Sequence, residues 1–401
     1  MKTTVTFSIL IIFGMTSMAF AESYPDLGVK VEIVAENLSI PWSIDFAPDG
    51  RIFFSERTGT LNVIDGSIQK QIMSLNVGGG EGGMLGIALD PDFESNHYIY
   101  IYYTYNEFLS TKNKLVRFVE SNNVLTEDKI LLENIPGASY HDGGRIKFGP
   151  DGKLYVTTGE AGNPSLSQRV DSVAGKILRI NSDGTIPDDN PWENSPVYSI
   201  GHRNPQGLDW DPVTGKLVIS EHGQSAHDEV NVIEPGKNYG WPDIIGDETK
   251  DGLTNPILHS GDDTWAPSGA AFYYGEEIPQ WNGKYFVASL RGQHLLVIDF
   301  DSDYNVISQE KLFWGEFGRL RDVVQGPDGL YILTSNQDGR GNPLPNDDRI
   351  LRVTSLYDIN NSPQWIKNIS KWLIDGLISE EELLDAFSYL NQKGILLNNN
   401  S

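Results

Sequence analysis

The sequence predicts an all-β fold, a six-bladed β-propeller followed by a short C-terminal α-helical hairpin. The first observation behind this prediction is a turn-and-strand unit that recurs along the chain. Residues 46–55 (FAPDGRIFFS) match residues 148–157 (FGPDGKLYVT), and residues 325–334 (QGPDGLYILT) form a third copy. The second observation is the composition, because 41 glycines and 21 prolines favour many turns and short strands over long helices.

Looser copies of the unit at 89–103, 211–220 and 281–289 bring the number to six over residues 28–355. Each copy places a Pro-Asp, Asn-Gly or similar turn before an apolar strand, as expected of a hairpin within a blade. Some copies are followed by a second strand, as at 60–64 and 295–299. The uneven spacing indicates blades joined by long loops, and a propeller of seven or eight blades is the main structural alternative.

Residues 1–21 have the pattern of a secretory signal peptide, with Lys2, an apolar stretch over 6–18 and the cleavage site Ala19-Phe20-Ala21. The alternative, a retained membrane anchor, is disfavoured because the apolar stretch is short for a spanning helix. No later segment is apolar enough to span a bilayer. We therefore expect a secreted mature chain, with a propeller domain over 22–355. The absence of cysteine excludes disulfides, thiolate metal sites and cysteine nucleophiles.

Residues 356–401 differ from the rest of the chain. Residues 362–374 (SPQWIKNISKWLI) carry a proline at the first helical position and apolar residues at helical spacing. Ser379 and Glu382 form a capping box before a second apolar periodic stretch. We expect two helices that pack on the propeller or on a neighbour.

The net charge of −25 excludes a general nucleic-acid binding role, which needs a basic face, but it permits a locally basic pocket. Four arginines stand in turns rich in glycine or asparagine, near the ends of predicted strands, where propeller loops converge on the central channel. Together they would suit a polyanion with carboxylates, which guanidinium groups bind through paired hydrogen bonds. Arginine–carboxylate pairs between blades are the alternative. The four are Arg203, Arg291, Arg319 and Arg321.

Three further features suggest chemistry. His141 is the best candidate for a general base, because the two glycines that follow Asp142 leave its ring open to a ligand. Trp265 could present a flat face to a planar ligand, with a core tryptophan as the alternative. The turn around Asp228 and Glu229 offers oxygen ligands of the kind that Ca²⁺ prefers.

At these residues the chain resembles the soluble pyrroloquinoline quinone (PQQ)-dependent sugar dehydrogenases, most closely the aldose sugar dehydrogenase branch. The resemblance covers about residues 28–355 and leaves out the tail. The motifs that carry it are specific only in combination. They lie at 40–46 (IPWSIDF), 82–86 (GGMLG), 141–152, 174–179 (AGKILR), 201–207 (GHRNPQG), 228–231, 238–242, 265–268 (WAPS) and 319–322 (RLRD).

The resemblance implies oxidation of an aldose at C1 to the lactone. His141 would take the proton of the anomeric hydroxyl while the C1 hydride passes to PQQ, and electrons would then pass to an external acceptor. Arg203 and Asn204 would lie against the quinone. The remaining assignments are Arg291, Arg319 and Arg321 for the PQQ carboxylates, Trp265 beside the sugar, and Gly223 and Gln224 for one Ca²⁺ through backbone carbonyls. A second Ca²⁺ would use Glu229 and a backbone oxygen of Tyr239.

Two positions depart from the family pattern. Glu81 stands where the family usually has glutamine, and a carboxylate there would repel PQQ unless it is protonated or paired, for instance with an arginine. Gln224 replaces a usual proline, which matters less because the ligand there is a carbonyl. We expect Glu81 to contact the cofactor.

Two other function classes compete with this hypothesis. A Ca²⁺-dependent hydrolase of the lactonase type would need several carboxylates and asparagines around one axial metal, and would not need four arginines. A binding propeller without catalysis would not need His141. We expect an aldose sugar as substrate, no nucleic-acid partner, no membrane span in the mature chain, and a monomer or homodimer.

Overall fold

The structure is a computed structural model that describes residues 21–108 and 110–356, together with residues 372, 377–379, 382–383 and 385–386. The chain divides into two compact units, one formed by Met1–Glu22 and Val31–Thr354 and the other by Ser23–Lys30 and Ser355–Ser401. The predicted signal peptide, apart from Ala21, lies outside the described residues. Among the described residues, no helix is both long enough and apolar enough to cross a membrane.

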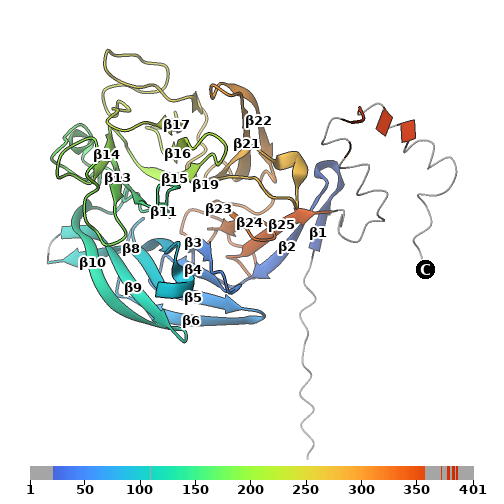
Figure 1. The fold of residues 1–401 in the computed structure, drawn as a ribbon, viewed down its shortest axis with the longest axis horizontal. Helices are drawn as coiled ribbons and strands as arrows, with labels where there is room; N and C mark the ends of the chain where they lie inside the picture. Colours follow the sequence, from blue (N-terminus) through green and yellow to red (C-terminus); the bar gives the residue numbers. More distant parts are fainter. Residues whose placement is uncertain are drawn as a thin grey trace, which may run out of the picture. The chain divides into compact units, whose positions relative to one another are not determined.

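The described strands form six sheets arranged around a central channel, as predicted for a six-bladed propeller (Figure 1). Five blades follow the chain directly, with sheet orders β3-β4-β5-β6, β10-β9-β8-β7, β11-β12-β13-β14, β15-β16-β17-β18 and β19-β20-β21-β22. In the sixth, β2 from the N-terminal region lies beside β25, in the order β1-β2-β25-β24-β23. The ring is thus closed by pairing the beginning of the propeller with its end.

Most strands are short, as the glycine and proline content predicts, but β8, β9 and β10 of the second blade have 10, 12 and 14 residues. Their bounds are β1 Ala21–Tyr24, β2 Val29–Ala35, β3 Pro41–Phe46, β4 Ile52–Glu56, β5 Thr60–Asp65, β6 Ile68–Ser74, β7 Met84–Leu89, β8 Tyr98–Glu107, β9 Ser110–Ser121, β10 Val124–Gly137, β11 Ile146–Phe148, β12 Leu154–Thr158, β13 Lys176–Ile180, β14 Val197–Ile200, β15 Pro205–Trp210, β16 Leu217–Glu221, β17 Glu229–Ile233, β18 Leu258–His259, β19 Pro267–Phe272, β20 Tyr285–Ser289, β21 His294–Phe300, β22 Val306–Leu312, β23 Leu320–Gly326, β24 Gly329–Thr334 and β25 Ile350–Ser355. The described helices are one turn each, namely η1 Pro25–Leu27, α1 Phe93–Asn96, η2 Pro164–Leu166 and η3 Pro279–Trp281.

The recurring Pro-Asp-Gly turn joins the first two strands of a blade. In the first blade Asp49 accepts the backbone N–H of Arg51 at 3.0 Å, and Gly50 has a φ of 89°. In the third blade Asp151 accepts the N–H of Lys153 at 3.0 Å, and Gly152 has a φ of 71°. The aspartate caps the turn, and the glycine takes the left-handed conformation that other residues avoid. The repeat is therefore a structural repeat.

The innermost strand of each blade faces the channel, and residues of all six line a cavity of about 200 Å³ there. Arg145, just before β11, crosses the channel and donates to Asp322 Oδ2 on β23 at 2.7 Å. The Arg145 guanidinium also lies 4.3 Å from the ring centroid of Trp42. A buried ion pair between the third and sixth blades therefore occupies the axis of the propeller.

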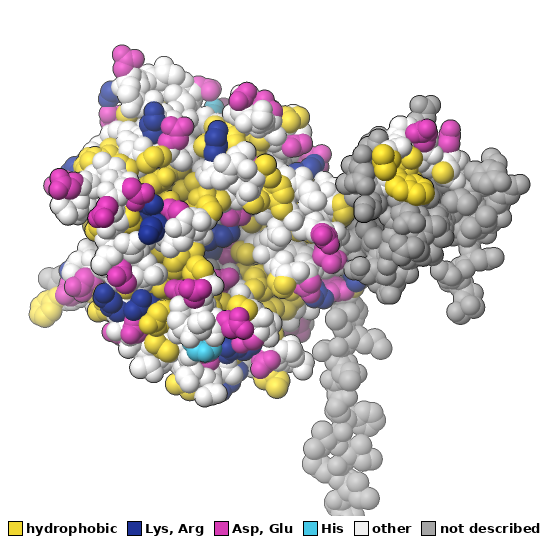
Figure 2. Space-filling view, viewed as in Figure 1, with side chains coloured by type: hydrophobic (Ala, Val, Ile, Leu, Met, Phe, Trp, Pro, Cys, Tyr) yellow, Lys and Arg dark blue, Asp and Glu magenta, His cyan; other side chains and the backbone are white. Residues whose placement is uncertain are grey.

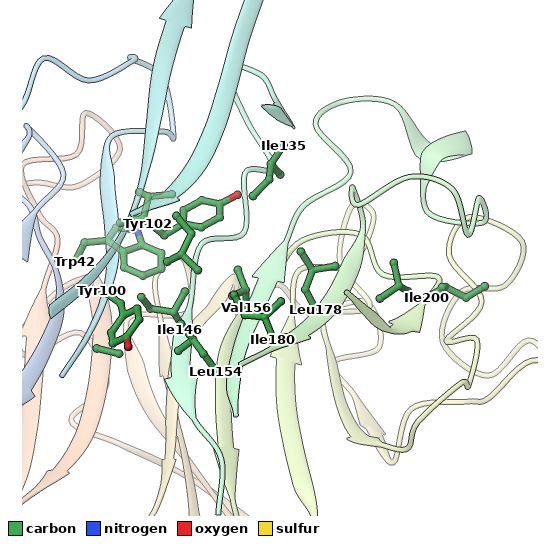
Figure 3. Packing of buried hydrophobic residues seen from close by; sticks show 14 residues of the cluster. Trp42, Tyr100, Tyr102, Ile135, Ile146, Leu154, Val156, Leu178, Ile180 and Ile200 are labelled. Atoms are coloured by element: carbon green, nitrogen blue, oxygen red, sulfur yellow. The ribbon is translucent and has the colours of Figure 1, made fainter. Parts of the chain in front are cut away.

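A hydrophobic cluster lies between the second and third blades, where aromatic side chains of β8 pack against the branched aliphatic residues of β11, β12 and β13 (Figure 3). Within it Tyr102 is fully buried, and its hydroxyl donates to the carbonyl of Asp142 at 3.1 Å. The core thus holds the backbone of the segment that carries His141.

Acidic and basic side chains are scattered over the face of the propeller seen in Figure 2, among apolar patches.

The predicted helical hairpin lies mostly outside the described residues. Two described residues of that region, Ser379 and Glu382, make the reciprocal hydrogen bonds of a capping box. The distances are 2.9 Å from the Ser379 N–H to Glu382 Oε2 and 3.2 Å from the Glu382 N–H to Ser379 Oγ.

Candidate active site

The candidate site lies at one end of the propeller, on the loops that join blades and on those that follow the second strand of a blade. Because strands alternate in direction, the Pro-Asp-Gly turns lie at the other end. The site is a cavity of about 270 Å³, near the lower end of the roughly 300–1,000 Å³ typical of small-molecule sites. Its charged and titratable lining residues are Arg57, Glu81, His222, Arg319, Arg321, Asp338 and Arg340.

His141 lies beside this cavity and is paired with a buried carboxylate. Its Nδ1 is hydrogen-bonded to Oε1 of Glu160, the second residue after β12, which is 2% exposed. If the carboxylate is ionised, it accepts the Nδ1 proton and leaves Nε2 as the basic nitrogen. Glu160 was not predicted from the sequence, although it lies only eight residues after the motif at 141–152 that contains His141.

The backbone of His141 is fixed by several close contacts. The residue has a φ of 61°, in the left-handed region, and its N–H donates to Glu81 Oε2 at 3.1 Å. Its carbonyl accepts the N–H of Ala161 at 3.0 Å and lies where a Cβ on Gly159 would be, at 1.9 Å. Such backbone strain is maintained only where the surroundings impose it, which is common at functional sites. Glycine is required at position 159 because a Cβ there would overlap the His141 carbonyl oxygen.

Glu81 is paired with an arginine, as its charge requires. Arg340 donates to Glu81 Oε1 at 2.7 Å. Burial raises the pKa of the Glu81 carboxyl, but the hydrogen bonds from Arg340 and from the His141 N–H outweigh this effect, so that the net pKa lies below its usual value. The carboxylate at this position is thus ionised and compensated.

Arg319 and Arg321 both lie in the cavity, and both are almost fully buried. Arg319 donates twice to Asp338 Oδ2, at 2.9 and 2.8 Å. Arg321 donates to Gln206 Oε1 at 3.1 Å, while its Nε has no hydrogen-bond partner. Burial and the neighbouring charge of Arg57 lower the pKa of Arg321 to about 9. The cavity thus keeps a positive charge that its own carboxylates do not fully neutralise.

Arg203 and Asn204 begin the fourth blade beside His222. The Arg203 guanidinium lies 5.2 Å from the ring centroid of Trp241, and its Nε has no hydrogen-bond partner. Asn204 is fully buried and accepts the N–H of Gly143 at 3.0 Å, but its amide Nδ2 is unpaired. Burial lowers the pKa of His222 to about 3, so the ring is neutral. Buried donors without partners are uncommon in native folds, and two residues that carry them here, Arg203 and Arg321, line cavities.

A second, much smaller cavity of about 10 Å³ adjoins Arg203, of a size for a single ion or water. Gly223, Gln224 and Glu229 line it, together with Glu221. Burial and the charge of Glu221 raise the pKa of Glu229 to about 8. A cation bound beside this carboxyl would stabilise its ionised form.

Tyr239 is not among the residues that line this small cavity, and its hydroxyl donates to the Val232 carbonyl at 2.7 Å. Within the described ranges, no group of three or more His, Asp or Glu side chains is arranged to hold a metal. A cation here would therefore depend on backbone carbonyls, as the resemblance implies. The turn that follows Gln224 has an unusual backbone, since residues 225–227 all have positive φ.

Two predicted site residues lie elsewhere. Arg291 is exposed, and its neighbour Leu290 lines the cavity in its place. Trp265 is 4% exposed and packs in a hydrophobic cluster with Val218 and Val230, which corresponds to the core alternative. Its backbone N–H donates to Asp228 at 2.7 Å, so the residue helps to order the turn at the small cavity.

Asp142, next to the candidate base, should make stability depend on pH. Burial raises the pKa of its carboxyl to about 6, and its Oδ2 has no hydrogen-bond partner. A raised folded-state pKa favours the protonated folded protein, so this residue lowers stability as pH rises from about 4 through 6. We expect Asp142→Asn to melt at a higher temperature than the wild type at pH 7.5 and at an equal or lower one at pH 4.5. A pH-independent difference in thermal melts would contradict the assignment.

Comparison with known proteins identifies the family of the chain. The family model described as glucose/sorbosone dehydrogenase matches residues 38–351. The chain belongs to this family. The resemblance inferred from the motifs is confirmed, and the cavity described above lies within the matched range.

Relatives of known name support this membership. The chain is 31% identical to an aldose sugar dehydrogenase of Escherichia coli, over 78% of this chain and 91% of that protein. It is 30% identical to quinoprotein glucose dehydrogenase B of Acinetobacter calcoaceticus, over 86% and 92%. The PQQ-bound structure of an aldose sugar dehydrogenase from Streptomyces coelicolor superposes with a TM-score of 0.74 at 38% identity, covering 81% of this chain and 98% of that one.

Proposed function

We propose that this member of the glucose/sorbosone dehydrogenase family is a PQQ- and Ca²⁺-dependent aldose sugar dehydrogenase that oxidises C1 to the lactone. The observation that carries the proposal is the juxtaposition of a carboxylate-paired histidine with a cavity that contains four arginines. The guanidinium groups of Arg57, Arg319, Arg321 and Arg340 outnumber the carboxylates of Glu81 and Asp338. An acidic protein that gathers positive charge in one cavity has a site for an anion.

The residues present suit PQQ, a planar tricarboxylate. The unpaired donors Arg321 Nε, Asn204 Nδ2 and Arg203 Nε are the groups that such a ligand would satisfy. PQQ supplies a two-electron acceptor for the hydride of the sugar. His141 Nε2 would receive the proton of the anomeric hydroxyl, and Glu160 would stabilise the resulting positive charge on the imidazole.

Ca²⁺ would be held at the small cavity by the carbonyls of Gly223 and Gln224, with Glu229 beside it. There it would act as a Lewis acid on the quinone. We further propose export of the mature chain, with delivery of electrons to an external acceptor.

The two competing functions fit the site less well. A lactonase-type hydrolase needs oxygen ligands around a metal on the propeller axis, and the Arg145–Asp322 ion pair occupies that axis. A binding propeller without catalysis gives no reason for a strained histidine paired with a buried glutamate.

Reconstitution tests the proposal. We expect the purified protein, supplied with PQQ and Ca²⁺, to reduce a redox dye in the presence of aldoses, and to require both additions. The controls are the same assay without PQQ and with PQQ but without sugar. No dye reduction with a panel of aldoses, together with no change in PQQ absorbance, would refute the proposed function.

A further inference from the structure

The cavity contains an arginine that no motif indicated, and it is the least satisfied of the four. Arg340 is paired with Glu81, and Arg319 is paired with Asp338. For Arg57, the hydrogen bond found within the described part of the chain runs from its Nη2 to the Asp338 carbonyl at 3.5 Å. That distance is at the outer limit for a hydrogen bond. The guanidinium therefore has capacity for a stronger acceptor.

The electrostatic environment of Arg57 also favours the binding of an anion. Burial outweighs the nearby carboxylates of Asp338 and Glu81 and lowers the pKa of Arg57, and Arg57 in turn is among the causes that lower the pKa of Arg321. Two poorly compensated guanidinium groups that repel each other are stabilised together when a carboxylate binds both.

The backbone of Arg57 is held in place before any ligand binds. It follows directly on β4, its N–H donates to the Ile40 carbonyl at 2.9 Å, and its carbonyl accepts the Met84 N–H at 3.2 Å. Gly83 has a φ of 145°, and a Cβ there would lie 2.1 Å from the Arg57 carbonyl oxygen. A residue fixed in this way loses little freedom on binding, which favours affinity.

We propose that Arg57 binds a carboxylate of PQQ and supplies the anchor that Arg291, being exposed outside the cavity, does not. This inference rests on the proposed function. It adds a binding residue that the family motifs did not identify.

Binding to the full-length apoprotein tests the proposal without relying on turnover. PQQ is titrated at constant Ca²⁺, with quenching of tryptophan fluorescence as the readout. Losing one charge-assisted pair should weaken binding by about tenfold to a hundredfold in Arg57→Gln. Arg169→Gln, which removes an exposed arginine paired with Asp171, is the matched control and should bind like the wild type.

The trimethyl ester of PQQ distinguishes a direct contact from a disturbed fold. The wild type should bind the ester much more weakly than PQQ, and this preference should shrink in Arg57→Gln because one charge contact is already absent. Arg57→Lys should recover part of the affinity. Equal PQQ affinity in wild type and Arg57→Gln, or an unchanged preference over the ester, would overturn the proposal. Failure of the wild type to bind PQQ would instead overturn the proposed function, and this inference with it.

Discussion

Replacing His141 with alanine should lower kcat for aldose oxidation by about 100- to 10,000-fold, the usual contribution of a general base. PQQ affinity should stay close to that of the wild type, because the imidazole is not among the cavity residues that carry its charge. Turnover is measured by dye reduction with the reconstituted enzyme, and cofactor affinity by fluorescence titration.

The left-handed backbone at His141 requires a second variant. With a φ of 61°, alanine at this position adds strain that histidine and asparagine tolerate better. His141→Asn should therefore show the same loss of kcat with a smaller loss of stability. His97→Asn is the matched control, because His97 also has a positive φ, of 54°, and lies beside α1 at the other end of the blades. Near-normal kcat in both His141 variants would refute its assignment as the base.

His141 could be predicted as the base from the sequence, but its pairing with Glu160 could not. The motif around His141 was recognisable from a histidine beside two glycines, which is a local pattern. Its pairing with Glu160 depends on the hairpin of β11 and β12, which brings residues 141 and 160 together. The same hairpin explains the close approach of Gly159. Proximity of this kind is a property of the folded blade.

The repeats did contain a signal for the missed residues. The copies at 46–55, 148–157, 211–220 and 325–334 each end with a serine or threonine at or near the end of the second strand, and polar site residues follow within a few positions. Those residues are Arg57, Glu160, His222 and Asp338. Aligning the copies on the strand end, instead of on the Pro-Asp-Gly turn, would have placed them on one rim.

Two residues at corresponding places in the blades, Arg291 and Trp265, do not contribute side chains to the cavity. Arg291 follows Ser289 at the corresponding place of the fifth blade, yet its side chain is exposed and outside the cavity. Trp265 likewise begins a blade on the site's side, but its ring packs into the core. Strand register determines at which end of a blade a residue lies, whereas side-chain direction depends on the packing of neighbouring blades.

Glu81 shows how one departure from a family pattern is accommodated. A carboxylate among arginines would weaken binding of an anionic cofactor if it stood alone. Here it accepts from Arg340 and from the His141 N–H, so it couples the arginine cluster to the backbone of the base. The net charge of the cavity stays positive because its four arginines outnumber the carboxylates of Glu81 and Asp338, and Arg321 shares Asp338 with Arg319 at 3.8 Å.

Asp338 should be the residue of this cavity with the largest effect on stability. Its side chain is 2% exposed and accepts two hydrogen bonds from Arg319, which is 7% exposed, and it also accepts the N–H of Arg340 at 2.9 Å. Removing one partner of a buried pair costs about 3–5 kcal/mol, since the other charge stays buried. We therefore expect apo Asp338→Asn to melt roughly 5–15 °C below the wild type.

The pH dependence of the melting temperature and its response to PQQ should identify why Asp338→Asn is less stable. Burial raises the pKa of Asp338, but Arg319 and the Arg340 N–H lower it more, so the net pKa lies below 3.8. The stabilisation that ionised Asp338 provides is therefore fully present above pH 3.8, and it is lost as the pH falls through the lower pKa of the folded state. The difference in melting temperature should be largest near neutral pH and shrink in acid.

Added PQQ should raise the melting temperature of Asp338→Asn more than that of the wild type, because its carboxylates compensate Arg319 in place of Asp338. Asp171→Asn, which breaks the exposed pair with Arg169, is the matched control and should melt like the wild type. If Asp338→Asn melts like the wild type, or if PQQ stabilises both proteins equally, the arginine cluster does not depend on this carboxylate for its charge balance.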